Sequence, residues 1–494
     1  MPWVRLHGTK DYLDMVKILD GYPDIHLTIN LVPSLVEQIE DYVQNTTKDR
    51  FLELSFKPAA TLNPQEKEFI LDKFFMIFKE RVISVAPRYY ELYLKKDSGK
   101  PFTTQDYLDL QVWFNLAWID PYFRRTTPEL SQIVGKARFF SEEDKLTVLY
   151  KQIDILEDIL PTYQRFIKRG QIEVIVSPYY HPILPLLYNN RIAKEANHKA
   201  TLPKTDFIYP EDAKAQIDKA VEFYKNKFGA APSGMWPSEE AVSEHILPFI
   251  IQAGINWIVS DEAILFKSLK KKKRDTALIY QPHLLKRKDG NLNIIFRDRN
   301  LSDLIGFVYQ SLKTQDAVTD LMGHLENIHK AFKDKDVLVT IAMDGENAWE
   351  YYPNDGADFL NLLYQNISGS KFIRTTTIKE YLKTHTPVSE IKPLAAGSWI
   401  FADFFKWIGN PAKNLAWEYL AKAREELKIV SDSLEPKAKE LAYKQIYIAE
   451  GSDWFWWYGE NQDDFDRLFR MHLTNFYTII GKAAPENLKK PLSA

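Results

Sequence analysis

The chain has no cysteine among its 494 residues. This absence excludes disulfide bonds, thiolate metal ligands and cysteine nucleophiles. The N-terminal residues show no apolar segment typical of a signal peptide. No run approaches the roughly 20 apolar residues that span a membrane. We therefore expect a cytoplasmic protein with no membrane partner.

The chain also lacks a strong charge of either sign, because its formal net charge is −3 at pH 7. Proteins that bind nucleic acid electrostatically are usually basic, so we do not expect a nucleic-acid partner. Glycine-rich phosphate loops and the Gly-x-Ser-x-Gly nucleophile motif are absent as well. These absences argue against nucleotide chemistry and against a serine hydrolase.

Aromatic residues are abundant: they make up 14 % of the chain and include 12 Trp and 26 Tyr. Trp and Tyr combine a flat apolar face with a hydrogen-bonding edge, which suits them to stacking on sugar rings. A large core would explain the same composition. Composition alone leaves both interpretations open.

Short apolar runs alternate with helical patterns along the first 385 residues, at 24–32, 171–178, 233–236, 255–265, 292–297 and 336–346. This alternation predicts βαβ units and a parallel sheet. We expect an α/β barrel over 1–385, with a helical insertion at about 57–140. Long helical patterns after residue 386 predict a C-terminal helical bundle over 386–494.

Polar residues follow these apolar runs, in "SPYYHP", "MWPSEE", "VSDE", "FRDRN" and "AMDGE". Active sites of parallel α/β barrels lie at the carboxyl ends of the strands. A glutamate of "MWPSEE" and Asp344 of "AMDGE" stand out, because a pair of carboxyl groups facing one site is the machinery of glycoside hydrolysis. A separation of ~5–5.5 Å between the two groups would indicate a retaining mechanism. Each acid alone is equally compatible with a surface ion pair.

A metal site built from His181, Asp261, Asp344 and Glu346 is the rival interpretation. The chain has only 10 His and no closely spaced pair of them, which disfavours it. We instead expect His181 to bind a substrate hydroxyl. Arg297 and Asp298 are expected either to pair with each other and position a loop, or to contact substrate. Ser302 is expected to cap the helix that follows them.

Two aromatic-rich segments, 397–411 and 451–460, lie near or within the C-terminal helices. Hydrophobic packing is the ordinary explanation for such clusters. Their interleaved polar residues suggest aromatic sugar subsites that fold over the barrel mouth.

Several segments together resemble glycoside hydrolase family 57, the α-amylase, amylopullulanase and 4-α-glucanotransferase group. They include "PWVRLHGTKDYLDM", "GQIEVIVSPYYHPILPLL", "GMWPSEEAVS", "DGENAWE" and "EGSDWFWWYGE". The resemblance implies an incomplete TIM-like (β/α)7 barrel followed by a helical bundle that completes the active site. It also implies a retaining mechanism on α-glucan without metal or cofactor, with Glu239 as nucleophile and Asp344 as acid/base. The expected substrate-binding residues are His181, Trp236, Asp261, Glu346, Trp349, Trp399, Asp453, Trp454 and Trp457.

The expected function is hydrolysis of α-1,4 glucans such as starch, glycogen or maltooligosaccharides, with α-1,6 cleavage of the amylopullulanase type as an added specificity. A 4-α-glucanotransferase is the first alternative, because only the group that resolves the intermediate differs. The second is an impaired glucan-binding protein, since a strand carrying His-Gln-Pro is expected upstream of "PWVRLH" in this family and the chain begins after that point. We expect an α-glucan partner and keep a homo-oligomer as an alternative to a monomer.

Overall fold

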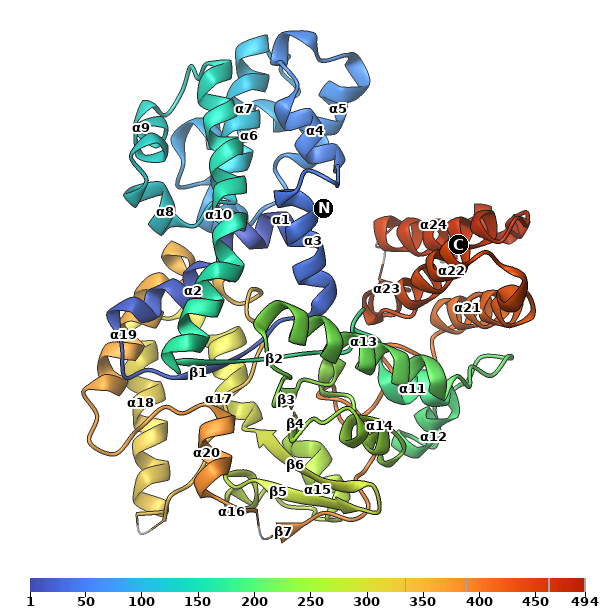
Figure 1. The fold of residues 1–494 in the computed structure, drawn as a ribbon. Coiled ribbons are helices and arrows are strands. Elements are labelled where there is room, and N and C mark those ends of the chain that lie inside the picture. The colour runs from blue at the N-terminus through green and yellow to red at the C-terminus, as the bar shows by residue number, and fades with distance from the viewer. Residues whose placement is uncertain (334, 388, 461–462, 493–494) are drawn as a thin grey trace.

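Short parallel strands lie at the centre of the chain (Figure 1). The computed structural model describes residues 1–494 except 334, 388, 461–462 and 493–494. One sheet pairs β1 (Leu27–Asn30) with β2 (Ile172–Ile175) in parallel. The second has the order β3-β4-β6-β5-β7, with bounds Gly234–Met235, Trp257–Asp261, Gly290–Arg297, His283–Arg287 and Ser389–Glu390.

The two sheets form one curved wall, because a parallel bridge between Val176 and Met235 links β2 to β3. Every residue of β2 and of β4 is buried. Parallel strands covered on both faces show such continuous apolar sequences. The carboxyl ends of β2, β3, β4 and β6 therefore open toward the same side.

Three features of the sheet differ from the sequence-based expectation. Residues 337–343 run extended but belong to no ladder of the described residues. Their backbone bonds include Leu338 N–H to Tyr280 O at 2.9 Å and Asp298 N–H to Thr340 O at 2.8 Å. An unexpected strand, β5, forms an antiparallel hairpin with β6. The short β7 pairs with β5 beyond residue 385, so the sheet continues past the expected end of the barrel.

Helices of the segment 50–169 stack above the sheets in Figure 1. Ser141 and Asp144 form a capping box that starts the long α10, and Gly170, with φ of 75°, ends it. The helices of this layer are α4 (Arg50–Phe56), α5 (Pro64–Lys73), α6 (Pro87–Asp97), α7 (Thr104–Ala117), α8 (Pro121–Thr126), α9 (Pro128–Lys136) and α10 (Glu142–Arg169).

Further helices surround the sheets. The N-terminal group contains α1 (Trp3–His7), a π-helical turn (Gly8–Tyr12), α2 (Asp14–Lys17) and α3 (Pro33–Val43). The central group contains α11 (Leu184–Tyr188), α12 (Ala193–Ala196), α13 (Pro210–Phe228), α14 (Leu247–Gln252), α15 (Glu262–Ser268) and α16 (Thr276–Ile279). The later group contains α17 (Arg299–Asp303), α18 (Thr314–Ala331), α19 (Ala357–Ser368) and α20 (Ile378–Thr384).

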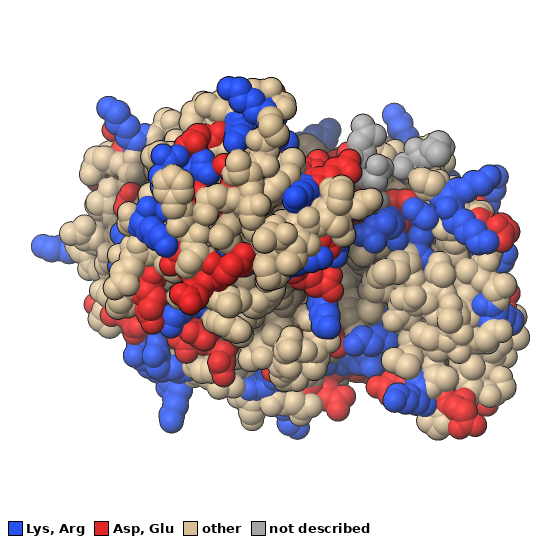
Figure 2. Space-filling view, turned by 90° about the horizontal axis from the view of Figure 1, so that it is seen from above, with Lys and Arg blue, Asp and Glu red and all other residues tan. Residues whose placement is uncertain are grey.

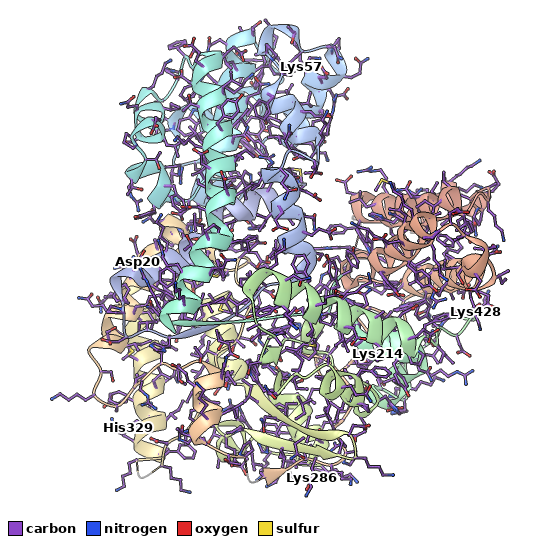
Figure 3. All side chains as sticks on the ribbon, in the orientation of Figure 1. Asp20, Lys57, Lys214, Lys286, His329 and Lys428 are labelled. Atoms are coloured by element: carbon purple, nitrogen blue, oxygen red, sulfur yellow. The ribbon has the colours of Figure 1, made fainter. Side chains whose placement is uncertain are left out.

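The C-terminal helices are α21 (Pro411–Val430), α22 (Pro436–Ala449), α23 (Ser452–Trp457) and α24 (Asp463–Ile479). They lie beside the sheets, at the right of Figure 1. An antiparallel bridge between Pro182 and Gly451 joins them to the loop after β2. Seen from above, the surface is hollowed between these helices and the larger part of the molecule (Figure 2). Figure 3 marks Lys428 at the end of α21, with Lys57 in the upper helices.

Candidate active site

The loop after β3 carries two consecutive glutamates, and only the first keeps exposed surface. Glu239 is half-buried, whereas Glu240 is completely buried. Their φ angles are 57° and 52°, in the left-handed region that side chains seldom adopt. Trp399 holds Glu239 twice: Nε1–H donates to the carboxyl Oε2 at 2.8 Å, and the backbone N–H donates to the carbonyl at 3.1 Å. The indole therefore fixes the orientation of this carboxyl group.

Glu240 is buried beneath Glu239 in the interior of the protein. Neither of its carboxyl oxygens has a hydrogen-bond partner among the described residues, and the nearest guanidinium nitrogen, Arg297 Nε, is 3.9 Å away. Burial raises the pKa of Glu240 to about 8, although Arg297 opposes the shift. A side chain with no exposed surface has no access to substrate, so Glu239 is the accessible acid of the pair.

Asp261 ends β4 and is completely buried. Arg297 Nε donates to its carboxylate at 2.9 Å, Arg299 Nε at 3.2 Å, and the N–H of Ala263 at 2.8 Å. These donors occupy both carboxylate oxygens, and the last one caps α15. This carboxylate is thus the buried counter-ion of two arginines, and its predicted contact with substrate stays a prediction.

Asp344 follows the extended segment 337–343 and keeps an exposed side chain. Asn347 Nδ2 donates to its Oδ2 at 3.0 Å. The loop lies tightly against the N-terminal helices, because a Cβ on Gly345 would approach Met15 Sδ at 3.2 Å. Surrounding protein reduces hydration and raises the pKa of Asp344, with a further contribution from the negative charge of Asp453.

The negative charge of Asp344 acts on Glu239. Burial raises the pKa of Glu239 to about 8, and the negative charge of Asp344 is the next largest cause. The hydrogen bond from Trp399 opposes this rise, since it stabilises the ionised carboxylate. Because the pKa of Glu239 is about 8, the pair retains a proton at neutral pH. Two carboxyl groups with one proton between them can act as one acid and one nucleophile.

Glu346 connects this site to the N-terminal helices. Burial and the charge of Asp344 raise its pKa to about 7, while His7 opposes the shift. His7 Nδ1 lies 2.6 Å from Asp11 Oδ2, and its ring packs against Trp118 with centroids 5.4 Å apart. His7 and Asp11 were not among the residues predicted from the sequence. Their spacing of four residues, which places them on one helix face, was the available signal.

His181 links the loop after β2 to α23. Its Nδ1 lies 2.8 Å from Ser452 Oγ, and its carbonyl accepts the N–H of Ser452 at 3.0 Å. Burial lowers the pKa of His181 to about 4, although the charge of Asp344 opposes the shift. The imidazole is therefore neutral at neutral pH and close enough to Asp344 to respond to its charge.

The aromatic segment 451–460 contributes an acid, Asp453, whose charge acts on the site. Asp453 is exposed, and its charge contributes to the raised pKa of Glu239. Trp454 and Trp457 are half-buried; Trp454 Nε1–H donates to Ile448 O at 2.7 Å, and Trp457 stacks on Phe465 with centroids 5.4 Å apart. Their predicted role in sugar binding stays a prediction.

The other two predicted tryptophans differ in exposure. Trp236 is half-buried, and its ring meets that of Trp399 edge-to-face at 5.6 Å. Trp349 is only 9 % exposed, donates from Nε1 to Gly345 O at 2.9 Å and packs against Tyr352. This ring packs in the core beneath the loop, and its predicted contact with substrate stays a prediction.

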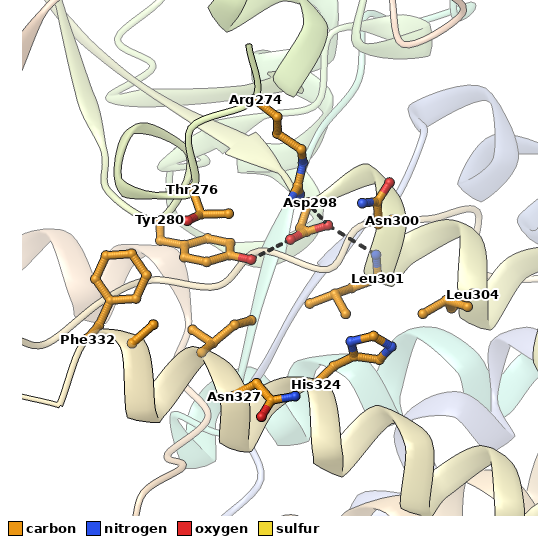
Figure 4. Close-up of a pocket in the computed structure, with 12 residues that line it drawn as sticks. Arg274, Thr276, Tyr280, Asp298, Asn300, Leu301, Leu304, His324, Asn327 and Phe332 are labelled. Atoms are coloured by element: carbon orange, nitrogen blue, oxygen red, sulfur yellow. Dashed lines mark hydrogen bonds and ion pairs between the residues drawn. The ribbon is translucent and has the colours of Figure 1, made fainter.

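Arg297 and Asp298 do not form the pair that was considered. Asp298 instead accepts hydrogen bonds from Tyr280 Oη at 2.6 Å and from Leu301 N–H at 3.1 Å, so it caps α17 in place of Ser302. A pocket of about 270 Å³ lies beside this group (Figure 4). Its charged residues Arg274 and Asp298 are paired with each other at 2.9 Å, and it contains none of the predicted site residues.

The described residues contain no group of three or more His, Asp or Glu side chains arranged to hold a metal ion. Within the same residues, no helix is long and apolar enough to cross a membrane.

Comparison with known proteins gives sequence relatives in one family. The family model described as Glycosyl hydrolase family 57 matches residues 1–393. Alpha-amylase 1 of Dictyoglomus thermophilum is 24 % identical over 337 residues, covering 58 % of this chain and 43 % of that protein. A 4-alpha-glucanotransferase of Thermococcus litoralis is 24 % identical over 278 residues, covering 54 % of this chain and 36 % of that protein. The chain thus spans less than half the length of these curated relatives.

Solved structures share the architecture. The GH57-type branching enzyme of Pyrococcus horikoshii superposes with a TM-score of 0.63 at 17 % identity, covering 97 % of this chain and 85 % of that one. The alpha-amylase AmyC of Thermotoga maritima gives 0.62 at 13 % identity, with 97 % and 88 % covered. The predicted (β/α)7 barrel with a helical domain is thereby confirmed. Since the family model also spans most of the sequence, the chain belongs to glycosyl hydrolase family 57.

Proposed function

We propose that the chain is a retaining α-glucan-active glycoside hydrolase with Glu239 as nucleophile and Asp344 as acid/base. The observation that supports this most strongly is the accessible carboxyl group of Glu239, held by the indole of Trp399 at 2.8 Å and close enough to Asp344 to respond to its charge. In the free protein Glu239 keeps a proton up to about pH 8, whereas catalysis requires the proton of the pair on Asp344. The hydrogen bond from Trp399 favours that distribution, because it stabilises the ionised form of Glu239 that acts as nucleophile. Asp344 has an exposed side chain and a raised pKa, as a proton donor requires.

The chemistry balances with these two groups alone. Glu239 attacks the anomeric carbon while Asp344 donates its proton to the oxygen of the leaving sugar, which leaves a glycosyl ester on Glu239. Asp344, now a carboxylate, takes a proton from water as that water attacks the ester. Glu239 departs as a carboxylate, and both groups return to their starting states.

The other residues of the site bind and orient the sugar. The neutral imidazole of His181 and the carboxyl group of Asp453 belong to the two segments that the bridge between Pro182 and Gly451 joins. They supply hydrogen-bonding groups for sugar hydroxyls. The half-buried rings of Trp236 and Trp399 supply apolar faces beside Glu239.

Transfer to a sugar hydroxyl is the second candidate, because one relative is a 4-alpha-glucanotransferase. A hydroxyl of a second glucan would then take the place of water in the last step. The α-1,4 bond is the proposed target, with α-1,6 cleavage as an added specificity.

A product profile tests the proposal. The purified chain is incubated with maltoheptaose, beside Glu239→Gln and the control Glu326→Gln, which changes an exposed acid on α18. Shorter products that vanish only in Glu239→Gln are expected for a hydrolase. Products longer than maltoheptaose would instead identify a transferase, and binding without turnover would favour a glucan-binding protein. Full turnover by Glu239→Gln would refute the assignment of the nucleophile.

A further inference from the structure

Two phenylalanines project from the loop that carries Trp399. Phe401 is 78 % exposed and Phe405 is 45 % exposed. Their ring centroids lie 6.1 Å apart, with 35° between the ring planes. Exposure of single apolar residues is ordinary, but two adjacent phenyl rings on one short loop form an apolar surface that water hydrates poorly.

The backbone under these rings is strained. Phe401 and Ala402 have φ angles of 52° and 53°. The left-handed region is unfavourable for residues with a Cβ, and two consecutive residues in it persist only where surrounding contacts impose the conformation. Such strain is concentrated at functional sites.

Several contacts impose this left-handed backbone conformation on the loop. Lys267 Nζ donates to the carbonyl oxygens of Ala396 at 2.9 Å and Ala402 at 3.0 Å. A Cβ on Gly397, whose φ is 153°, would lie 2.4 Å from Ala402 O, so the chain folds tightly back on itself. Ser398 Oγ donates to Asp403 O at 2.7 Å. The loop is thus held rigidly from below while its rings face solvent.

The same loop reaches the candidate nucleophile. Trp399 donates both its indole and its backbone N–H to Glu239. Successive Cα atoms are about 3.8 Å apart, so the Cα of Phe401 lies at most about 7.6 Å from that of Trp399. The two phenyl rings therefore lie within the length of a few glucosyl units from Glu239.

Polar groups flank the rings. Asn197 Nδ2 donates to Asp403 Oδ2 at 2.8 Å, and Lys406 Nζ lies 2.7 Å from Glu460 Oε1. Lys406 Nζ also lies 4.5 Å above the ring of Trp456. Sugar rings have apolar C–H faces and polar hydroxyl edges, which match aromatic surfaces bordered by hydrogen-bonding groups.

We propose that Phe401 and Phe405 form an outer platform on which a glucosyl unit of an α-glucan stacks, beyond the units next to the cleaved bond. This inference rests on the proposed function and adds a preference for longer chains. The rigid loop lowers the entropy cost of binding, because the rings are already ordered in the free protein. A second copy of the chain is the competing occupant of the same rings.

The test compares the double variant Phe401→Ala/Phe405→Ala with the unaltered chain. The value of kcat/KM is measured on the shortest maltooligosaccharide that reacts and on maltoheptaose. Loss of two stacking contacts is expected to lower kcat/KM for maltoheptaose by about tenfold, mainly through KM. The value for the shortest substrate is expected to change by less than about twofold, since that substrate does not reach the platform.

Phe139→Ala is the matched control, because Phe139 is 66 % exposed and has a φ of 58° but follows α9 in the upper helices. Phe401→Trp, which keeps an aromatic face, is expected to retain the preference for maltoheptaose. Thermal melts check that the double variant remains folded.

Equal kcat/KM values of the double variant and the unaltered chain on both substrates would overturn the platform while leaving the proposed function intact. Loss of a dimer in sedimentation, with unchanged kinetics, would assign the rings to a second copy instead. If the unaltered chain neither binds nor turns over maltoheptaose, both proposals are overturned together.

Discussion

The indole nitrogen of Trp399 lies 2.8 Å from Oε2 of Glu239, although 160 residues separate them along the chain. This contact joins the loop after β3 to the segment that leads into the C-terminal helices. It is a hydrogen bond to a carboxyl group in a poorly hydrated site, where such bonds have their largest effect on ionisation.

Trp399→Phe removes that donor and keeps an aromatic ring. The ionised form of Glu239 loses its hydrogen bond, so its pKa rises further above about 8. A hydrogen bond to a charged group contributes about 1.5 to 3 kcal/mol, which corresponds to a loss of roughly 10- to 100-fold in kcat/KM. The acidic limb of the pH profile of kcat/KM is expected to move to higher pH. Trp113→Phe, which removes an indole hydrogen bond to Ala137 O at 3.0 Å in the upper helices, serves as the control. An unmoved limb in Trp399→Phe would contradict the role given to the indole.

Glu239→Gln is expected to change how stability depends on pH. The folded chain holds the proton of Glu239 up to about pH 8, whereas an unfolded carboxyl releases it near 4.5. Between these values the folded state binds more protons, so the free energy of unfolding contributed by Glu239 falls as pH rises. The neutral amide has no such dependence.

The melting temperature of Glu239→Gln relative to the unaltered chain should therefore increase steadily from pH 5 to pH 8. Thermal melts at several pH values measure this difference. A difference that stays constant across that range would mean that the carboxyl group is not held protonated in the folded protein.

The order of strands and helices could be predicted from the sequence because parallel strands that are buried on both faces read as apolar runs. Their polar carboxyl ends pointed to Asp344, His181 and the glutamates after β3, and the family resemblance selected Glu239. The charge of Asp344 acts on both Glu239 and His181, so these distant segments lie close together, while their catalytic and binding roles stay predictions. Asp261 and Trp349 follow the same pattern but are buried. The pairing of Asp261 with Arg299, 38 residues away, depends on how the loops fold and leaves no local signal.

Two of the errors in predicting the strands have different causes. The segment 337–343 has the apolar pattern of a strand, but a ladder also needs a partner at the right register, which the pattern does not specify. The hairpin of β5 and β6 was missed although Asp289 and Gly290 are a turn signal between two strand-forming runs. Here the sequence contained the information.

Trp349→Ala tests the assignment of that ring to the core. A Cβ on Gly356 would lie 2.5 Å from the indole, so the ring fills its space closely. Truncation of a buried Trp is expected to lower the free energy of unfolding by about 3 to 5 kcal/mol. Urea denaturation measures this loss. A fully stable variant with a weakened KM for maltoheptaose would instead restore Trp349 as a sugar-binding residue.

Lys10 forms a buried ion pair with Asp355 in the loop that follows Trp349. Lys10 also lowers the raised pKa values of Asp14 and Asp120, the latter at about 6. Lys10→Met leaves these acids without their cation. Removing one partner of a buried pair typically costs about 3 to 5 kcal/mol of unfolding free energy.

The pH dependence of that loss distinguishes lost charge from lost packing. Protonation neutralises the buried acids that have lost Lys10. The stability deficit of Lys10→Met should therefore be large at pH 8 and shrink as the pH falls toward the pKa of Asp120, about 6. Adding Asp355→Asn to Lys10→Met should recover part of the loss at high pH, because one uncompensated charge disappears. A deficit that is equal at all pH values, and that Asp355→Asn does not relieve, would show that Lys10 acts through its aliphatic chain, and the ion pair would then have no part in holding the Asp344 loop against the N-terminal helices.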